Sequence, residues 1–207
     1  MVSVIYPVKV MAELEAHMRV SREKAAENRQ RIVDTAARLF RENGFDGVGV
    51  DTIMRAAGLT HGGFYGHFKS KDDLAAEATA LAMERSSERQ ERFASLEDLV
   101  TDYLSERHRA NRANGCAIAA LGADIAREGD NVRRGLTGHV RAQIGRIASL
   151  LRGGTAASRR RRALATLSGM VGALTLARAV NDPVLSKQIL AAARETFGPA
   201  GQARRRQ

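Results

Sequence analysis

The chain has 207 residues, of which 44% are hydrophobic and 27% charged, with a formal net charge of +10. These values are typical of a globular protein of one or two domains and exclude a disordered or fibrous chain. No run of about 20 apolar residues occurs, which excludes a membrane-spanning segment, and the single cysteine suits a reducing compartment. We therefore expect a cytoplasmic protein.

The predicted elements begin with an irregular arm over residues 1–18, which show no strong period. A helix is predicted over Arg22–Asn43, because an apolar stripe recurs there at helical spacing: Ile32, Ala36, Leu39 and Phe40. Gly44 is its natural stop. Two short helices follow, over about 51–57 and 61–67, with Thr60 as the N-cap of the second. Ser70–Asp73 then resembles a capping box that opens a long helix to about Phe93.

The C-terminal part predicts further helices over about 95–110, 116–127, 130–151 and from Ser158 onward. Asp182-Pro183 is an N-cap followed by proline at the first helical position, which opens a last helix to about Phe197. Residues 198–207 are expected to form a disordered basic tail. Because alanine, leucine and arginine are abundant and only three prolines occur, we predict an all-α fold of about nine helices.

The two short helices, joined by Gly58-Leu59-Thr60, have the arrangement of a helix-turn-helix, whose second helix enters the major groove of DNA. Its sequence, His61 to His67, contains three glycines, each costing about 1 kcal/mol in helix propensity. Phe64 and Phe68 must therefore anchor it, while glycine permits close approach to a phosphate or base. No acidic residue occurs over 52–70, although residues 1–93 carry 14 basic and 14 acidic side chains and are neutral overall.

The stretch Ile32–Leu74 resembles the TetR family of bacterial regulators. Its signature positions are occupied by Leu39, Phe40, Gly44, Phe45, Ile53, Ala57, Gly58, Leu59, Thr60, Tyr65, His67, Phe68 and Lys71. The resemblance implies a three-helix DNA-binding domain over residues 19–70. It also implies a ligand-sensing and dimerisation bundle over 71–197, and a repressor that a small molecule releases from a palindromic operator.

The same resemblance assigns the residues that contact double-stranded DNA. Those expected to face the groove are Thr60, His61, Gly62, Gly63 and Tyr65. His67 and Lys71 would contact phosphates, and Arg22 and Lys24, with Arg19, would reach the backbone or a minor groove. One departure stands out, because Val48 and Gly49 occupy positions where the family usually has Thr-Ser or Thr-Thr, and valine cannot make the expected phosphate contact.

A homodimer is expected, because one short reading helix contacts few bases and two half-sites about 34 Å apart make a palindrome readable. In the family the last two helices form the dimer interface. The residues expected there are Leu164, Leu167, Val171 and Leu174, with the small Gly169 and Gly172. Ordinary core packing is the alternative for these residues.

The unknown small-molecule effector is expected inside the C-terminal bundle, with Phe93, Tyr103, His108 and Cys116 as the candidate lining residues. Cys116 stands at a predicted helix start, where backbone dipoles favour the thiolate. It is therefore either a reactive sensor, as in some regulators of this family, or a small buried hydrophobe. The five histidines show no metal-ligand spacing and no cofactor motif appears.

Two other classes of protein remain as alternatives. The first is a helical ligand-binding or scaffold protein whose DNA-binding head has decayed, for which Val48 and Gly49 are the evidence. Thr60, Tyr65, His67 and Lys71 argue against it. The second is an enzyme, but the sequence shows no nucleophile–base pair and no phosphate-cradling loop, so we predict that the chain is not an enzyme.

Overall fold

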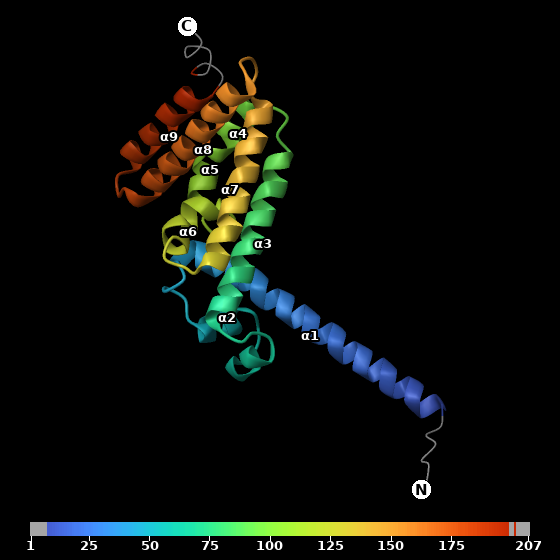
Figure 1. Cartoon of the computed structure of the whole chain (residues 1–207). Helices are drawn as coiled ribbons and strands as arrows, with labels where there is room; N and C mark the ends of the chain where they lie inside the picture. The colour runs from blue at the N-terminus through green and yellow to red at the C-terminus, as the bar shows by residue number, and fades with distance from the viewer. Residues whose placement is uncertain (1–7, 199–200, 202–207) are drawn as a thin grey trace.

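The protein is built from helices packed into a small N-terminal unit and a larger upright bundle (Figure 1). The computed structural model describes the backbone of residues 8–198 and of Gly201, and the side chains from Arg22 onward. These residues form nine α-helices, one 3₁₀-helix and no strand, which confirms the predicted all-α fold. Of the tail predicted over 198–207, all but Gly198 and Gly201 lies outside the described residues, as do residues 1–7 of the predicted arm.

The N-terminal unit consists of α1 (Val8–Asn43), α2 (Val50–Ala56) and the 3₁₀-helix η1 (His61–Gly66). Helix α1 ends where predicted, because Gly44 adopts a φ of +76°, which favours glycine, and its N–H donates to the Phe40 carbonyl at 2.8 Å. The segment predicted as a third short α-helix is instead a 3₁₀-helix, one residue shorter. Thr60 stands at its N-cap, but its side chain makes no capping hydrogen bond.

The start of α1 corrects the prediction for residues 8–18, which are helical and not irregular. No proline follows Pro7 there, alanine, glutamate and methionine recur, and Leu14 is present. These residues have high intrinsic helix propensity. They continue the hydrogen-bond ladder of α1. In Figure 1 this part of α1 runs away from the body of the molecule.

The bundle contains α3 (Lys71–Glu91), α4 (Leu96–Tyr103), α5 (Glu106–Ala110), α6 (Ala117–Ile125), α7 (Asp130–Leu150), α8 (Ala156–Ala179) and α9 (Pro183–Phe197). The caps predicted at Ser70 and Asp182 are confirmed by hydrogen bonds from Asp73 N and Val184 N. The helix predicted over 95–110 is wrong in one respect, because it is divided into α4 and α5. Ser105 accepts from the His108 N–H and starts a new helix there.

Two hydrophobic clusters form the core. The first joins α1, α2 and η1 to the first half of α3 and to α6, whose Ala117, Leu121 and Ile125 are buried in it. The second lies among α4, α7, α8 and α9. Helices α3 and α6 therefore connect the N-terminal unit to the bundle through shared core side chains.

The expected interface residues of α8 divide between core and surface. Leu167 and Leu174 are buried inside the chain, which corrects the expectation that they face a second subunit. They lie on the face of α8 that packs into the second cluster. Phe197 covers Gly169, where a Cβ atom would lie 1.9 Å from the ring. The large apolar side chains that remain exposed on α8 and α9 are Leu164, Leu176, Val184 and Leu185.

None of the described helices combines the length and the apolar character that crossing a membrane requires.

Candidate functional site

The η1 segment is held in place by two buried phenylalanines, as the sequence predicted. Phe64 is 1% exposed and Phe68 4%, and their rings stack with centroids 5.7 Å apart. The guanidinium of Arg29 lies over the Phe68 ring, 4.5 Å from its centroid, and its Nη1 donates to Glu77 at 2.7 Å. Arg29 thus ties α1 to α3 across the base of η1. A segment with poor helix propensity is rigid here because its neighbours fix it.

The opposite side of η1 faces solvent. Tyr65 is 71% exposed and packs its ring edge-to-face on Phe64, with centroids 5.3 Å apart. Thr60, His61, Gly62 and Gly63 are exposed, and His67 and Lys71 are half-buried at the two sides of the turn into α3. We call this set, Thr60–Gly63 with Tyr65, His67 and Lys71, the reading surface. Arg22 and Lys24 are exposed on α1, where Lys24 pairs with Glu27 at 3.5 Å.

Glycine on the reading surface is not required by the fold. A Cβ atom at Gly62 meets nothing within 4 Å, and one at Gly63 makes only ordinary contacts at 3.7 Å. Neither residue has a positive φ. The missing side chains therefore leave the backbone open to an approaching molecule on the solvent side. This is the property that close contact with a phosphate or base edge needs.

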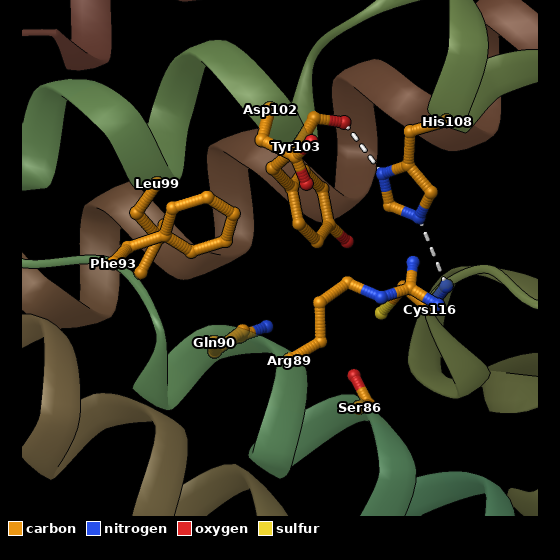
Figure 2. A pocket seen from close by; sticks show the side chains of 9 residues that line it. All are labelled: Ser86, Arg89, Gln90, Phe93, Leu99, Asp102, Tyr103, His108 and Cys116. Atoms are coloured by element: carbon orange, nitrogen blue, oxygen red, sulfur yellow. Dashed lines mark hydrogen bonds between the residues drawn. The ribbon is translucent and has the colours of Figure 1, made fainter.

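The bundle contains a small cavity of about 20 Å³ between α3, α4, α5 and the start of α6 (Figure 2). All four residues predicted to contact an effector line this bundle cavity: Phe93, Tyr103, His108 and Cys116. It adjoins a wider cleft of about 370 Å³, which shares Phe93 and His108 and also holds Arg92 and Arg107. An apolar interior thus opens toward guanidinium groups.

His108 connects two sides of the cavity through both of its ring nitrogens. Nδ1 lies 2.7 Å from the Tyr103 carbonyl, which can only accept, so Nδ1 carries the proton. Nε2 accepts from the Cys116 N–H at 3.0 Å, as the dashed lines in Figure 2 show. The imidazole is therefore neutral, in agreement with the lowered pKa of His108 that burial causes.

Two buried polar atoms beside the cavity make no hydrogen bond within the described part of the chain, the Tyr103 hydroxyl and Gln90 Oε1. Burial raises the pKa of Tyr103 well above its usual value, and the neighbouring Cys116 raises it further. Buried polar groups are normally paired. A ligand with a polar group in the cavity would satisfy both atoms.

Cys116 is buried at the N-cap of α6, which confirms its predicted place at a helix start. Its burial is what a small packing residue shows. It also lines the cavity, so a role in sensing stays a prediction.

Residues 32–78 match the family model described as "Bacterial regulatory proteins, tetR family". Over 64 residues the chain is 42% identical to the HTH-type transcriptional regulator AcrR of Shigella flexneri. The aligned stretch covers 31% of this chain and 30% of that protein. The chain thus matches less than a third of the length of this curated relative.

The fold is also similar to solved structures over most of the chain. A TetR-family regulator from Cytophaga hutchinsonii superposes with a TM-score of 0.69 over 84% of this chain and 94% of the other, at 17% identity. A TetR regulator from Chloroflexus aurantiacus gives a TM-score of 0.67 over 86% and 97%, at 25% identity.

The N-terminal unit and the start of α3 are therefore similar in sequence to TetR-family regulators. The fold of the described residues is similar to that of the solved TetR proteins.

The departure from the Thr-Ser or Thr-Thr pair that is usual in the TetR family has a structural reason at its first position. Val48 is only 2% exposed and belongs to the first hydrophobic cluster. Gly49 is the N-cap of α2 in extended backbone, is exposed, and makes no side-chain cap. The chain therefore uses the first position for packing and leaves the second without a polar side chain.

Sequence reasoning missed several residues of the bundle cavity. Ser86, Arg89 and Gln90 line it together with Phe93. Ser86, Arg89 and Gln90 stand at i, i+3 and i+4 near the end of α3, the spacing of one helix face, and Phe93 follows two residues after the helix ends. The spacing of these residues from Phe93 was the signal in the sequence that could have identified them. Leu99 and Asp102 of α4 complete the lining.

Proposed function

We propose that this TetR-family chain is a sequence-specific DNA-binding transcription regulator. It acts in the cytoplasm as a homodimer that represses transcription from a palindromic operator, and it is not an enzyme. The observation that carries the proposal is the reading surface, a glycine-containing segment anchored from behind by Phe64 and Phe68 and exposed in front at Tyr65. The high exposure of an aromatic side chain on a rigid support is typical of a binding residue.

A mobility-shift assay with the upstream region of the chain's own gene tests this function. The wild-type chain is expected to shift the fragment, and Tyr65→Ala to abolish the shift. Arg141→Ala, which changes an exposed side chain of α7, is the control. The rival class, a scaffold protein with a decayed head, predicts no shift for any of the three proteins.

The dimer is supported by the large apolar side chains that α8 and α9 expose, Leu164, Leu176, Val184 and Leu185. Three of them lie near the turn that joins the two helices, Leu176 close to the end of α8 and Val184 and Leu185 at the start of α9. Exposed apolar side chains that gather on one surface mark association sites. Light scattering is expected to give the mass of two chains for the wild type. The double variant Leu176→Glu/Leu185→Glu is expected to give the mass of one chain, because it buries charges in the interface.

Release from the operator is assigned to a small molecule that occupies the adjoining cleft and reaches into the bundle cavity. The apolar ring surfaces of Phe93 and Tyr103, the unpaired Tyr103 hydroxyl and Gln90 Oε1, and the arginines of the adjoining cleft support a planar ligand with polar substituents. A compound library is screened for loss of DNA binding. Tyr103→Phe is expected to raise the concentration needed about ten-fold, because it removes one buried hydrogen bond.

A further inference from the structure

A separate cleft opens at the junction of the two domains, where the end of α1 meets α6 and α8. We call it the arginine cleft, because its lining includes Arg41, Arg112 and Arg178, together with Glu42 and Thr175. It has a volume of about 200 Å³ and shares no lining residue with the bundle cavity or its adjoining cleft.

Arg41 contributes a buried positive charge to the lining of this cleft. It is 6% exposed, and the hydrogen bond that fixes it runs from Nε to the Ala113 carbonyl at 2.6 Å. Burial, with the nearby Arg85 and Arg89, lowers the pKa of Arg41 to about 10, so it is still a cation at neutral pH. A buried cation is usually paired with an anion. Its hydrogen-bond partner here is a neutral carbonyl.

The other two guanidinium groups also donate to backbone carbonyls. Arg178 donates from Nε to Arg109 O and from Nη2 to His108 O, at 3.2 and 2.8 Å. Its Nη1 is buried and has no acceptor in the described part of the chain. Arg112 donates from Nη2 to the Arg178 carbonyl at 2.9 Å. The cleft therefore contains guanidinium N–H groups that can donate hydrogen bonds to an anionic oxygen of a ligand.

The charges of the lining residues do not balance. Three guanidinium groups face one carboxylate, that of Glu42. Asp124 lies against Gly44 at the edge of the cleft, but it is already paired with Arg127 at 2.8 Å. The lining thus carries a net charge of about two units, which a doubly charged group compensates and a single carboxylate does not.

We propose that the arginine cleft is a second ligand site, which binds a phosphate group. A phosphate carries about −1.5 to −2 charges at neutral pH and accepts several hydrogen bonds, and guanidinium is the side-chain group whose geometry fits it best. Because Arg41 belongs to α1 and Arg178 to α8, the bound group joins the N-terminal unit to the bundle. The source is either free inorganic phosphate or the phosphate of a small metabolite ester.

Isothermal titration calorimetry on the full chain without DNA tests the site, with sodium chloride holding the ionic strength constant. The probes are inorganic phosphate and glucose 6-phosphate. Saturable binding with one site per chain is expected. Arg112→Gln and Arg178→Gln are each expected to weaken it about ten-fold, the effect of losing one charge-assisted hydrogen bond. Arg112 is exposed, so its replacement leaves the core intact.

Arg141→Gln, an equal charge change on the exposed side of α7, is expected to bind as the wild type does. Equal affinity for the two probes supports free phosphate as the ligand, and tighter binding of the ester supports a metabolite. The proposal is overturned if neither probe gives saturable heat, or if Arg112→Gln and Arg178→Gln bind as tightly as Arg141→Gln.

Discussion

Arg41 Nε donates to the carbonyl of Ala113 at 2.6 Å, which joins the last turn of α1 to the loop between α5 and α6. Neighbouring carbonyls of the same loop region accept from other arginines, Asn114 O from Arg89 and His108 O from Arg178. This loop also positions Cys116 and His108 at the bundle cavity. A ligand that moves the loop therefore acts on α1, whose Arg29 lies over the Phe68 ring and so supports the reading surface.

Arg41→Ala is expected to lower the free energy of unfolding by about 2–3 kcal/mol, because it removes a buried charge-assisted hydrogen bond and the packing of the side-chain stem. Urea denaturation monitored by circular dichroism measures the change. Arg38→Ala, one turn earlier and exposed, is expected to change stability by less than about 0.5 kcal/mol. Equal effects of the two variants would show that the bond to Ala113 contributes nothing specific.

Gly62→Ala is expected to fold as the wild type does and to bind operator DNA at least about ten-fold more weakly. Its φ is not positive and its Cβ meets no protein atom, so the added methyl group obstructs only what approaches from solvent. Fluorescence anisotropy with a labelled duplex measures the loss. Gly145→Ala adds the same methyl group to an open position on α7 and is expected to leave affinity unchanged. Undiminished binding by Gly62→Ala would place the DNA elsewhere.

Replacing Val48 and Gly49 by residues that are usual in the family is expected to have opposite effects on stability. Val48→Thr buries a hydroxyl and is expected to lower stability by about 1–3 kcal/mol. Gly49→Ser adds a cap to α2 in backbone that already suits one, so a gain of a few tenths of a kcal/mol is expected. Its hydroxyl also supplies a phosphate contact, so DNA affinity is expected to rise. Thermal unfolding and anisotropy check the two effects, and a stabilised Val48→Thr would contradict the burial of that side chain.

The neutral His108 predicts a pH dependence of stability. Its folded-state pKa is lowered, first by burial and then by Arg178 and Arg89, while the Tyr103 carbonyl and Asp102 oppose the shift. The pKa of a histidine in the unfolded chain is about 6.5. Below that pH, His108 is protonated in the unfolded chain while the folded chain keeps it neutral, which favours unfolding. The stabilisation is therefore complete above about pH 6.5 and declines as the pH falls toward the lowered value.

Urea denaturation at several pH values between 7 and 5 is expected to show this decline, with a shallower slope for His108→Gln. His139 contributes in the same direction, because burial lowers its pKa too. A His108→Gln slope equal to that of the wild type would contradict a neutral buried imidazole.

The sequence predicted the structure well where only one type of residue can serve a given structural role. Gly44 ended α1 because a left-handed φ is needed there, and Phe64 and Phe68 were the only large apolar side chains able to anchor η1. The reading surface followed from these residues and from the family signature. Of the residues that line the bundle cavity, only those with aromatic, imidazole or thiol side chains were predicted from the sequence: Phe93, Tyr103, His108 and Cys116.

Other features depend on contacts between elements that are distant in the sequence. Leu164 and Leu167 look alike in the stripe of α8, but only packing against the second cluster decides that Leu167 is core and Leu164 surface. The break at Ser105 arises from one side-chain hydrogen bond that competes with a helix. The arginine cleft assembles side chains from three separate segments, for which a linear pattern gives no signal.

The most direct measurement is the affinity of the purified chain for its upstream duplex as a function of salt concentration. Affinity is expected to fall steeply with salt, Tyr65→Ala to eliminate sequence preference, and Lys71→Gln to reduce the salt slope by about one unit. Absence of binding to any double-stranded fragment at low salt, with the chain folded and dimeric, would contradict the assignment of the reading surface to DNA binding.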